Sequence, residues 1–135
     1  MEAIVKEIEQ AKSSIRIQAY SFTNQSLGQA LLAANKKGIK IEVILDRENL
    51  GNPHSLLWLL HEVQISIYLD DKHQIAHNKI MIIDSSVVIT GSANFTKAGD
   101  ESNAENSLII RDNKLAARYI TNWQLHKEHS PRFNP

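Results

Sequence analysis

The sequence predicts an α/β fold in which helices cover both faces of a mixed, largely parallel β-sheet. Strand-like and helical apolar patterns alternate in the first half of the chain, and an order of strand, helix and strand favours parallel pairing across a crossover helix. Two apolar strands at the middle of the chain read as a hairpin. At 135 residues, of which 42% are hydrophobic, the chain has the length and the core of one domain.

The first half contains two predicted helices and two predicted strands. Ile4 and Ile8 fall on one stripe of a helix over residues 2–13. A second helix has Asn24 as its N-cap and Gly38 directly after its end. The other predicted bounds are a strand at 15–22, the second helix at 25–37 and a strand at 39–45.

The second half begins with an Asn-Pro pair at 52–53, which predicts the start of a helix. The Asp-Ser-Ser sequence at 84–86 predicts the turn of a hairpin over 79–92. We expect the domain to span residues 1–130 and residues 131–135 to form a tail. The remaining predicted elements are a helix at 52–63, a strand at 65–69, a polar loop at 95–105, a strand at 106–111 and an amphipathic helix at 113–129.

The bulk composition excludes several kinds of site. Lys and Arg together number 15, as do Asp and Glu, so the formal net charge is zero and any site for a polyanion must be a local patch. The absence of cysteine excludes disulfides and Cys-based zinc sites. No apolar run approaches ~18 residues, so we expect no transmembrane segment. The N-terminus lacks a signal-peptide pattern and opens on a helix, so we expect a preceding strand or leader to have been left out.

The segment HNKIMIID at residues 77–84 carries the elements of a phosphate site. His77 and Lys79 flank one residue, so on a strand they point to the same face. The lysine can hold anionic oxygens, and the histidine can attack phosphorus or transfer a proton. The alternative for this pair is the solvated edge of a hairpin.

The segment GSAN at residues 91–94 adds two polar side chains to this site. The hydroxyl of Ser92 and the amide of Asn94 can donate to phosphate oxygens, although ordinary turn chemistry would also explain them. Glu105 lies where the next strand begins. Its carboxylate could bond the second ring nitrogen of His77 and fix the tautomer of that ring; taken alone, it would be a surface carboxylate.

These residues resemble the HKD motif of the phospholipase D superfamily, which is matched at every defined position by His77-x-Lys79-x4-Asp84-x6-Gly91-Ser92-x-Asn94. The flanking segments are similar to those of the small bacterial endonucleases with one HKD motif per chain, whose glutamate falls on Glu105. The resemblance covers most of residues 3–127. It implies that Asp84 and Gly91 support the site, and that the first strand of the family fold, before residue 2, is missing.

The resemblance implies a two-step hydrolysis of a phosphodiester without a metal or other cofactor. One histidine attacks phosphorus, and a second histidine protonates the leaving oxygen and then activates water. Histidine suits both roles, because its ordinary pKa lies near ~6.5. The chain has one HKD motif, so the simplest source of the second is an identical subunit across a two-fold axis. We therefore expect a homodimer with one composite site where His77 meets its copy.

Other polar residues near the motif have weaker assignments. We expect Lys72 and Lys97 to contact substrate phosphates from loops on either side of the site. Tyr20 and Phe22 either line the cleft or pack in the core. The remaining histidines are expected to hold no metal, because the HKEH sequence at 126–129 has no set of Cys or Asp partners and suits a helix C-terminus. These histidines are His54, His61, His73, His126 and His129.

Three functions follow, in order of preference. The first is an endonuclease that cuts DNA, or also RNA, with little sequence preference, since phosphate contacts carry no sequence information. The second is a phospholipase D or cardiolipin-type lipid phosphodiesterase, although no basic interfacial helix is present. The third is a non-catalytic nucleic-acid-binding module, which the presence of both His77 and Lys79 disfavours. The resemblance implies a periplasmic or secreted bacterial protein if a leader was removed.

Overall fold

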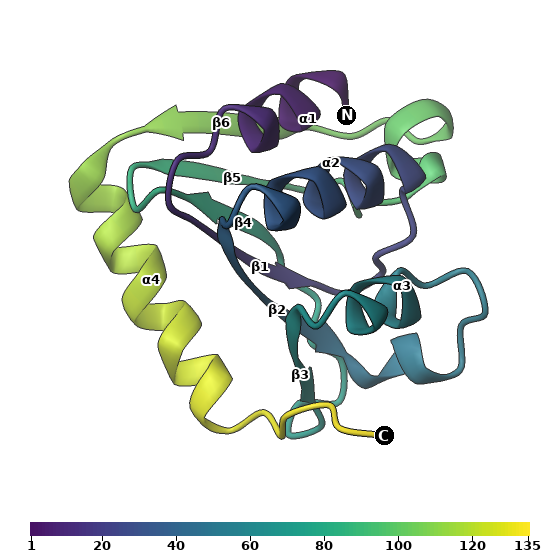
Figure 1. The fold of residues 1–135 in the computed structure, drawn as a ribbon. Helices are drawn as coiled ribbons and strands as arrows, with labels where there is room; N and C mark the ends of the chain where they lie inside the picture. The colour runs from purple at the N-terminus through teal and green to yellow at the C-terminus, as the bar shows by residue number, and fades with distance from the viewer.

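The computed structural model describes residues 1–135 and contains one mixed sheet with the strand order β3-β2-β1-β4-β5-β6 (Figure 1). The strands are β1 Ser14–Ala19, β2 Lys40–Asp46, β3 Ser66–Asp70, β4 Lys79–Ile83, β5 Val87–Gly91 and β6 Ser107–Arg111. β1, β2 and β3 pair in parallel, whereas β4, β5 and β6 join antiparallel. The predicted mixed α/β class is confirmed. The sheet is less parallel than expected, because crossover helices connect only the first three strands and tighter connections reverse the chain afterwards.

Helices cover both faces of the sheet, as predicted (Figure 1). α1 Glu2–Glu9, α2 Gln25–Lys36 and α3 Leu57–Glu62 pack on one face over the larger core, and α4 Asn113–Glu128 packs on the other. Burial on both faces explains why every residue of β4 is buried. Trp123 anchors α4 in the second core, and its indole N–H donates to the carbonyl of Ile17 at 2.9 Å.

Local signals in the sequence set several element ends. The Asn24 side chain accepts a hydrogen bond from the amide of Leu27 at 3.1 Å, so the predicted N-cap of α2 is confirmed. Asp84 and Ser85 both have φ of 55°, as a tight hairpin turn requires. The predicted helix start at 52–53 is wrong. Asn52 Oδ1 accepts from the amide of His54 at 2.9 Å, so this segment forms a turn, and α3 begins only at Leu57.

Two segments expected to be irregular are structured. A single π-helical turn, η2 Ala98–Ser102, lies within the predicted polar loop. The predicted tail is attached to the edge of β3, because the carbonyl of Pro131 accepts from the amide of Leu69 at 2.9 Å and the amide of Phe133 donates to Ile67 at 2.8 Å. None of the helices has both the length and the hydropathy needed to cross a membrane.

Candidate active site

His77 and Lys79 meet at the start of β4, as their spacing predicts. Lys79 Nζ lies 2.9 Å from His77 Nδ1 and donates to the carbonyl oxygen of His77 at 2.8 Å. Lys79 is 8% exposed, whereas His77 is exposed to solvent. The ring of Tyr20 packs edge-on against the imidazole with centroids 5.1 Å apart, so Tyr20 belongs to the site. Phe22 instead lies in the core against Phe95.

The environment of Lys79 weakens its hold on a proton. Burial lowers the pKa of the Lys79 ammonium below its ordinary value, and the negative charge of Glu105 partly opposes this effect. A partly desolvated cation attracts an incoming anion more strongly than a fully solvated cation does. Lys79 is therefore placed to bind a phosphate.

Ser92, directly after β5, and Glu105, shortly before β6, form a second pair. Ser92 Oγ donates to Glu105 Oε1 at 3.2 Å and accepts from the amide of Asn106 at 3.0 Å. The structure thus places Glu105 on Ser92, and no hydrogen bond joins it to the ring of His77 as the sequence had led us to expect. His77 Nδ1 faces Lys79 instead.

Gly91 permits the close approach of these two strands. A Cβ atom at Gly91 would lie 2.0 Å from the carbonyl oxygen of Asn106, far inside van der Waals contact. Only glycine allows β6 to pass this near, so the supporting role predicted for Gly91 has a steric basis. Asn94 is half-buried, and its Oδ1 atom is buried without a hydrogen-bond partner.

An open cleft of about 610 Å³ holds the exposed part of the site. It includes three residues that the sequence had not singled out, namely Thr90 of β5 and Tyr119 and Asn122 of α4. His77 is the only histidine in it, and no carboxylate lines it. The nine lining residues are His77, Asn78, Lys79, Ile80, Thr90, Gly91, Ser92, Tyr119 and Asn122.

The two lysines expected at the substrate lie outside this cleft. Lys97 Nζ is 4.0 Å from Glu101 Oε2, and both residues line a separate depression. Lys72 is exposed and donates its backbone amide to Asp70 Oδ1. Both positions were predicted from nearness in sequence, which the loop geometry does not follow.

Asp84 supports the fold, as predicted. Its carboxylate accepts from the amides of Lys12, Ser13 and Ser14 at 2.8–3.1 Å and from the Ser13 hydroxyl at 3.0 Å. Burial alone would raise the pKa of the Asp84 carboxyl, but these hydrogen bonds outweigh it and lower that pKa. Asp84 therefore fastens the start of β1 to the hairpin turn.

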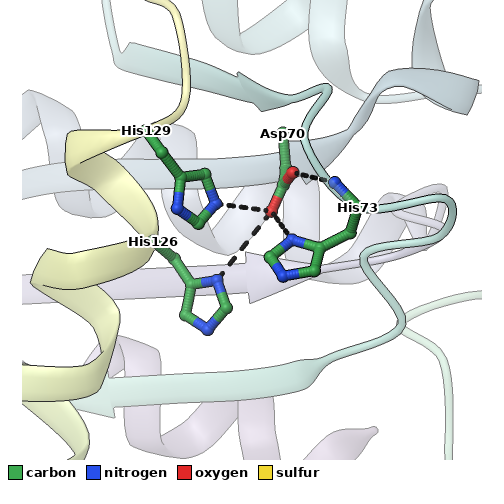
Figure 2. Close-up of side chains that lie close together, drawn as sticks. All are labelled: Asp70, His73, His126 and His129. Atoms are coloured by element: carbon green, nitrogen blue, oxygen red, sulfur yellow. Dashed lines mark hydrogen bonds and ion pairs between the residues drawn. The ribbon is translucent and has the colours of Figure 1, made fainter.

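A group of histidines lies elsewhere, around the end of β3. His73, His126 and His129 converge on the buried carboxylate of Asp70 (Figure 2). The expectation that these histidines hold no metal assumed that no Asp or Cys partner was present, and that premise is wrong. The partner is supplied by β3, more than fifty residues before α4 ends, so local spacing could not reveal it.

Comparisons with known proteins agree with this fold and motif. A family model described as "Cardiolipin synthase, PLD-like domain" matches residues 4–125. A phospholipase D from Rickettsia prowazekii (strain Madrid E) is 45% identical over 120 residues, which are 89% of this chain and 58% of that protein. The chain thus spans less than two thirds of the length of this relative.

Two solved structures are also similar. Nuc, a phospholipase D family member from Salmonella typhimurium, superposes with a TM-score of 0.93 at 32% identity, covering 99% of this chain and 90% of that one. NucT from Helicobacter pylori superposes with a TM-score of 0.89 at 27% identity, covering 98% and 89%. The matched family model, the shared fold and the complete HKD motif lead to one conclusion: the chain belongs to the phospholipase D superfamily.

Proposed function

We propose that this protein is a metal-independent phosphodiesterase, that it cuts nucleic acid, foremost DNA, with little sequence preference, and that it works through a phosphohistidine formed at a composite homodimer site. The contact between Lys79 and His77 carries this proposal. It joins a partly desolvated cation to an exposed imidazole at the mouth of an open cleft. A bound phosphodiester would place an anionic oxygen on Lys79 and its phosphorus in reach of the ring.

In this proposal the nucleophile is Nε2 of His77, because Nδ1 is the ring nitrogen that faces Lys79. A neutral imidazole that accepts at Nδ1 carries its proton on Nε2, and that tautomer cannot attack. An entering phosphate competes for the Lys79 ammonium and releases Nδ1. The ring then shifts its proton to Nδ1, which leaves the Nε2 lone pair free. Substrate binding thereby activates the nucleophile.

The reaction needs a second histidine, and none lines the cleft besides His77. In the first step Nε2 attacks phosphorus, the bond to the leaving oxygen breaks, and the His77 imidazolium of a second copy protonates that oxygen. In the second step the same ring, now neutral, takes a proton from water. The hydroxide attacks phosphorus and breaks the P–N bond, which returns both histidines to their starting states.

Nucleic acid fits the form of the cleft better than a lipid does. The cleft is open and polar, and no carboxylate lines it to repel a polyanion. The donors of the cleft would contact the phosphate groups of the substrate, so cleavage would require no surface that recognises bases. Nuc and NucT each superpose along about nine tenths of their own length. This similarity over nearly the whole of two small proteins supports the proposal that the chain acts as a small enzyme on nucleic acid.

The same chemistry on a lipid phosphodiester is the second candidate. The observations that favour it are the description of the matched family model and the name of the Rickettsia prowazekii relative. A lipid phosphodiester would engage the same Lys79 and His77, so the contact between these two residues does not distinguish the two substrates.

The test is to incubate supercoiled plasmid, single-stranded DNA, RNA and cardiolipin vesicles with the protein in EDTA. We expect nucleic-acid cleavage that His77→Asn reduces roughly a thousandfold or more, and that weakens steeply with added salt as counterions are released. His54→Asn is the matched control, because His54 lies outside the cleft. Loss of cleavage in EDTA at a temperature where the protein stays folded would contradict the metal-free mechanism. Turnover of cardiolipin without cleavage of any nucleic acid would contradict the nuclease proposal and would favour the lipid phosphodiesterase.

A further inference from the structure

Three imidazoles surround one carboxylate at the end of β3 (Figure 2). Asp70 is the last residue of β3 and is fully buried, His73 lies in the loop that follows, and His126 and His129 lie at the end of α4. Asp70 Oδ2 is 3.0 Å from His73 Nδ1, 3.1 Å from His129 Nε2 and 3.9 Å from His126 Nδ1. The three histidine rings stand with centroids 5.2–5.4 Å apart.

The donor set and its spacing fit a tetrahedral zinc ion. The four ligand atoms lie within 4.8 Å of one another. Zinc bonds to imidazole and carboxylate are about 2.0–2.2 Å long, which sets tetrahedral ligands about 3.4 Å apart. Ring movements on the order of an ångström would therefore close the cluster around an ion. We propose that Asp70, His73, His126 and His129 form a Zn²⁺ site.

An unpaired buried nitrogen supports this proposal. His126 Nδ1 is buried without a hydrogen-bond partner, and it points toward the shared carboxylate oxygen (Figure 2). A buried polar atom without a partner is costly, and a metal ion would satisfy it. No donor or acceptor of the chain lies within hydrogen-bonding distance of this nitrogen.

The groups of the cluster influence one another electrostatically. Burial lowers the pKa of the His126 ring, and the neighbouring His129 and His73 lower it further. Burial alone would raise the pKa of Asp70, but hydrogen bonds from His129 and His73 and from backbone amides lower it to about 2. The amides of Lys72 and His73 bond Oδ1, whereas the rings of His73 and His129 bond Oδ2. A bound ion would take the place of these two ring contacts on Oδ2, and the amides would hold the carboxylate in position.

The ion would stabilise the fold and would take no part in catalysis. None of its four ligands lines the cleft of His77. Four protein ligands fill a tetrahedral zinc site and leave no open position for substrate. The bound ion would join β3 and the end of α4 to the loop that leads from His73 to His77, and would thus restrict the motion of the segment that carries His77. This zinc site goes beyond the proposed function and does not depend on that function.

The experiment measures zinc binding to the untagged full chain by metal analysis and calorimetry, with magnesium and calcium as comparison ions. We expect one equivalent of Zn²⁺ and, at a hundredfold excess over Kd, a rise in Tm of roughly 10 °C. His126→Ala combined with His129→Ala should weaken binding at least about a hundredfold and abolish the shift. His54→Ala, which removes an exposed histidine outside the cluster, should change neither.

A second readout keeps the proposal testable if the double variant does not fold. Cobalt added to the wild-type protein should give the visible absorption of a tetrahedral site, and zinc should displace it. The proposal is overturned if the wild type binds no zinc, if the folded double variant binds it equally well, or if bound cobalt is octahedral. Cleavage in EDTA below the melting temperature of the metal-free protein is read separately, so a failure here leaves the proposed function standing.

Discussion

The ammonium of Lys79 lies 2.9 Å from Nδ1 of His77 and 2.8 Å from the carbonyl oxygen of the same residue. The cation of the HKD motif thus contacts the imidazole that we propose as the nucleophile. This contact links substrate binding to the tautomer of the ring, and it makes Lys79 the residue whose replacement is most informative.

Replacement of Lys79 by methionine should lower activity and raise stability together. The anionic oxygens lose their cation, so kcat should fall about a hundredfold to a thousandfold. The free energy of unfolding should rise, because an apolar side chain of similar length replaces a buried ammonium whose pKa is lowered by burial. Cleavage rates and Tm of Lys79→Met measure both effects, with exposed Lys72→Met as the control. A drop in Tm with full activity would contradict this role.

The pH dependence of substrate affinity should report the charge of Glu105. Burial lowers the pKa of Lys79 and Glu105 opposes this, so the affinity for DNA should fall on the alkaline side below the ordinary lysine pKa of 10.5. Glu105→Gln removes the opposing charge, so it should move that alkaline limb to still lower pH. Glu101→Gln, which removes an exposed carboxylate paired with Lys97, should leave the limb in place. An unmoved limb in Glu105→Gln would show that Glu105 does not act on Lys79.

Asp84→Asn should destabilise the fold without changing the rate per folded molecule. The variant loses charge-assisted bonds to the segment before β1, so urea unfolding at neutral pH should show a loss of about 2–4 kcal/mol. The pKa of Asp84 is lowered in the fold, so its contribution is present above the unfolded value of 3.8 and is lost as pH falls below it. The variant should therefore lose less stability than the wild type on acidification. Exposed Asp71→Asn is the control.

Gly91→Ala should damage the site through the backbone. The added methyl group would meet the carbonyl oxygen of Asn106, which must shift together with β6 and the amide that holds Ser92. We expect a loss of about 1–3 kcal/mol in stability and reduced cleavage. Gly51→Ala is the matched control, since its nearest neighbour would be 4.0 Å away. Equal stability of the two variants would rule out the close approach.

The sequence predicted the parts of the site that depend on local geometry. His77 and Lys79 alternate at the start of one strand, so their meeting followed from strand periodicity. The Asp-Ser-Ser turn and the Asn24 cap were likewise local signals. These features need no knowledge of how distant segments pack.

The parts that the sequence did not reveal depend on long-range packing. Tyr119 and Asn122 reach the cleft only because α4 crosses the far face of the sheet. Glu105 accepts from Ser92 because β6 runs beside β5, and the sequence spacing alone does not decide between the two nearby donors, Ser92 and His77. The carboxylate of Asp70 meets His129 across fifty-nine residues of sequence. Asn52 failed as a helix start because its side chain closes a turn instead.

Subunit mixing tests the central claim, that two copies of His77 form one site, most directly. Wild type and His77→Asn are refolded together in varied proportions, and cleavage is measured at a constant total concentration. A mixed dimer has a single His77, so activity should fall with the square of the wild-type fraction. Activity in direct proportion to that fraction would show that each chain works alone, and would contradict the composite site.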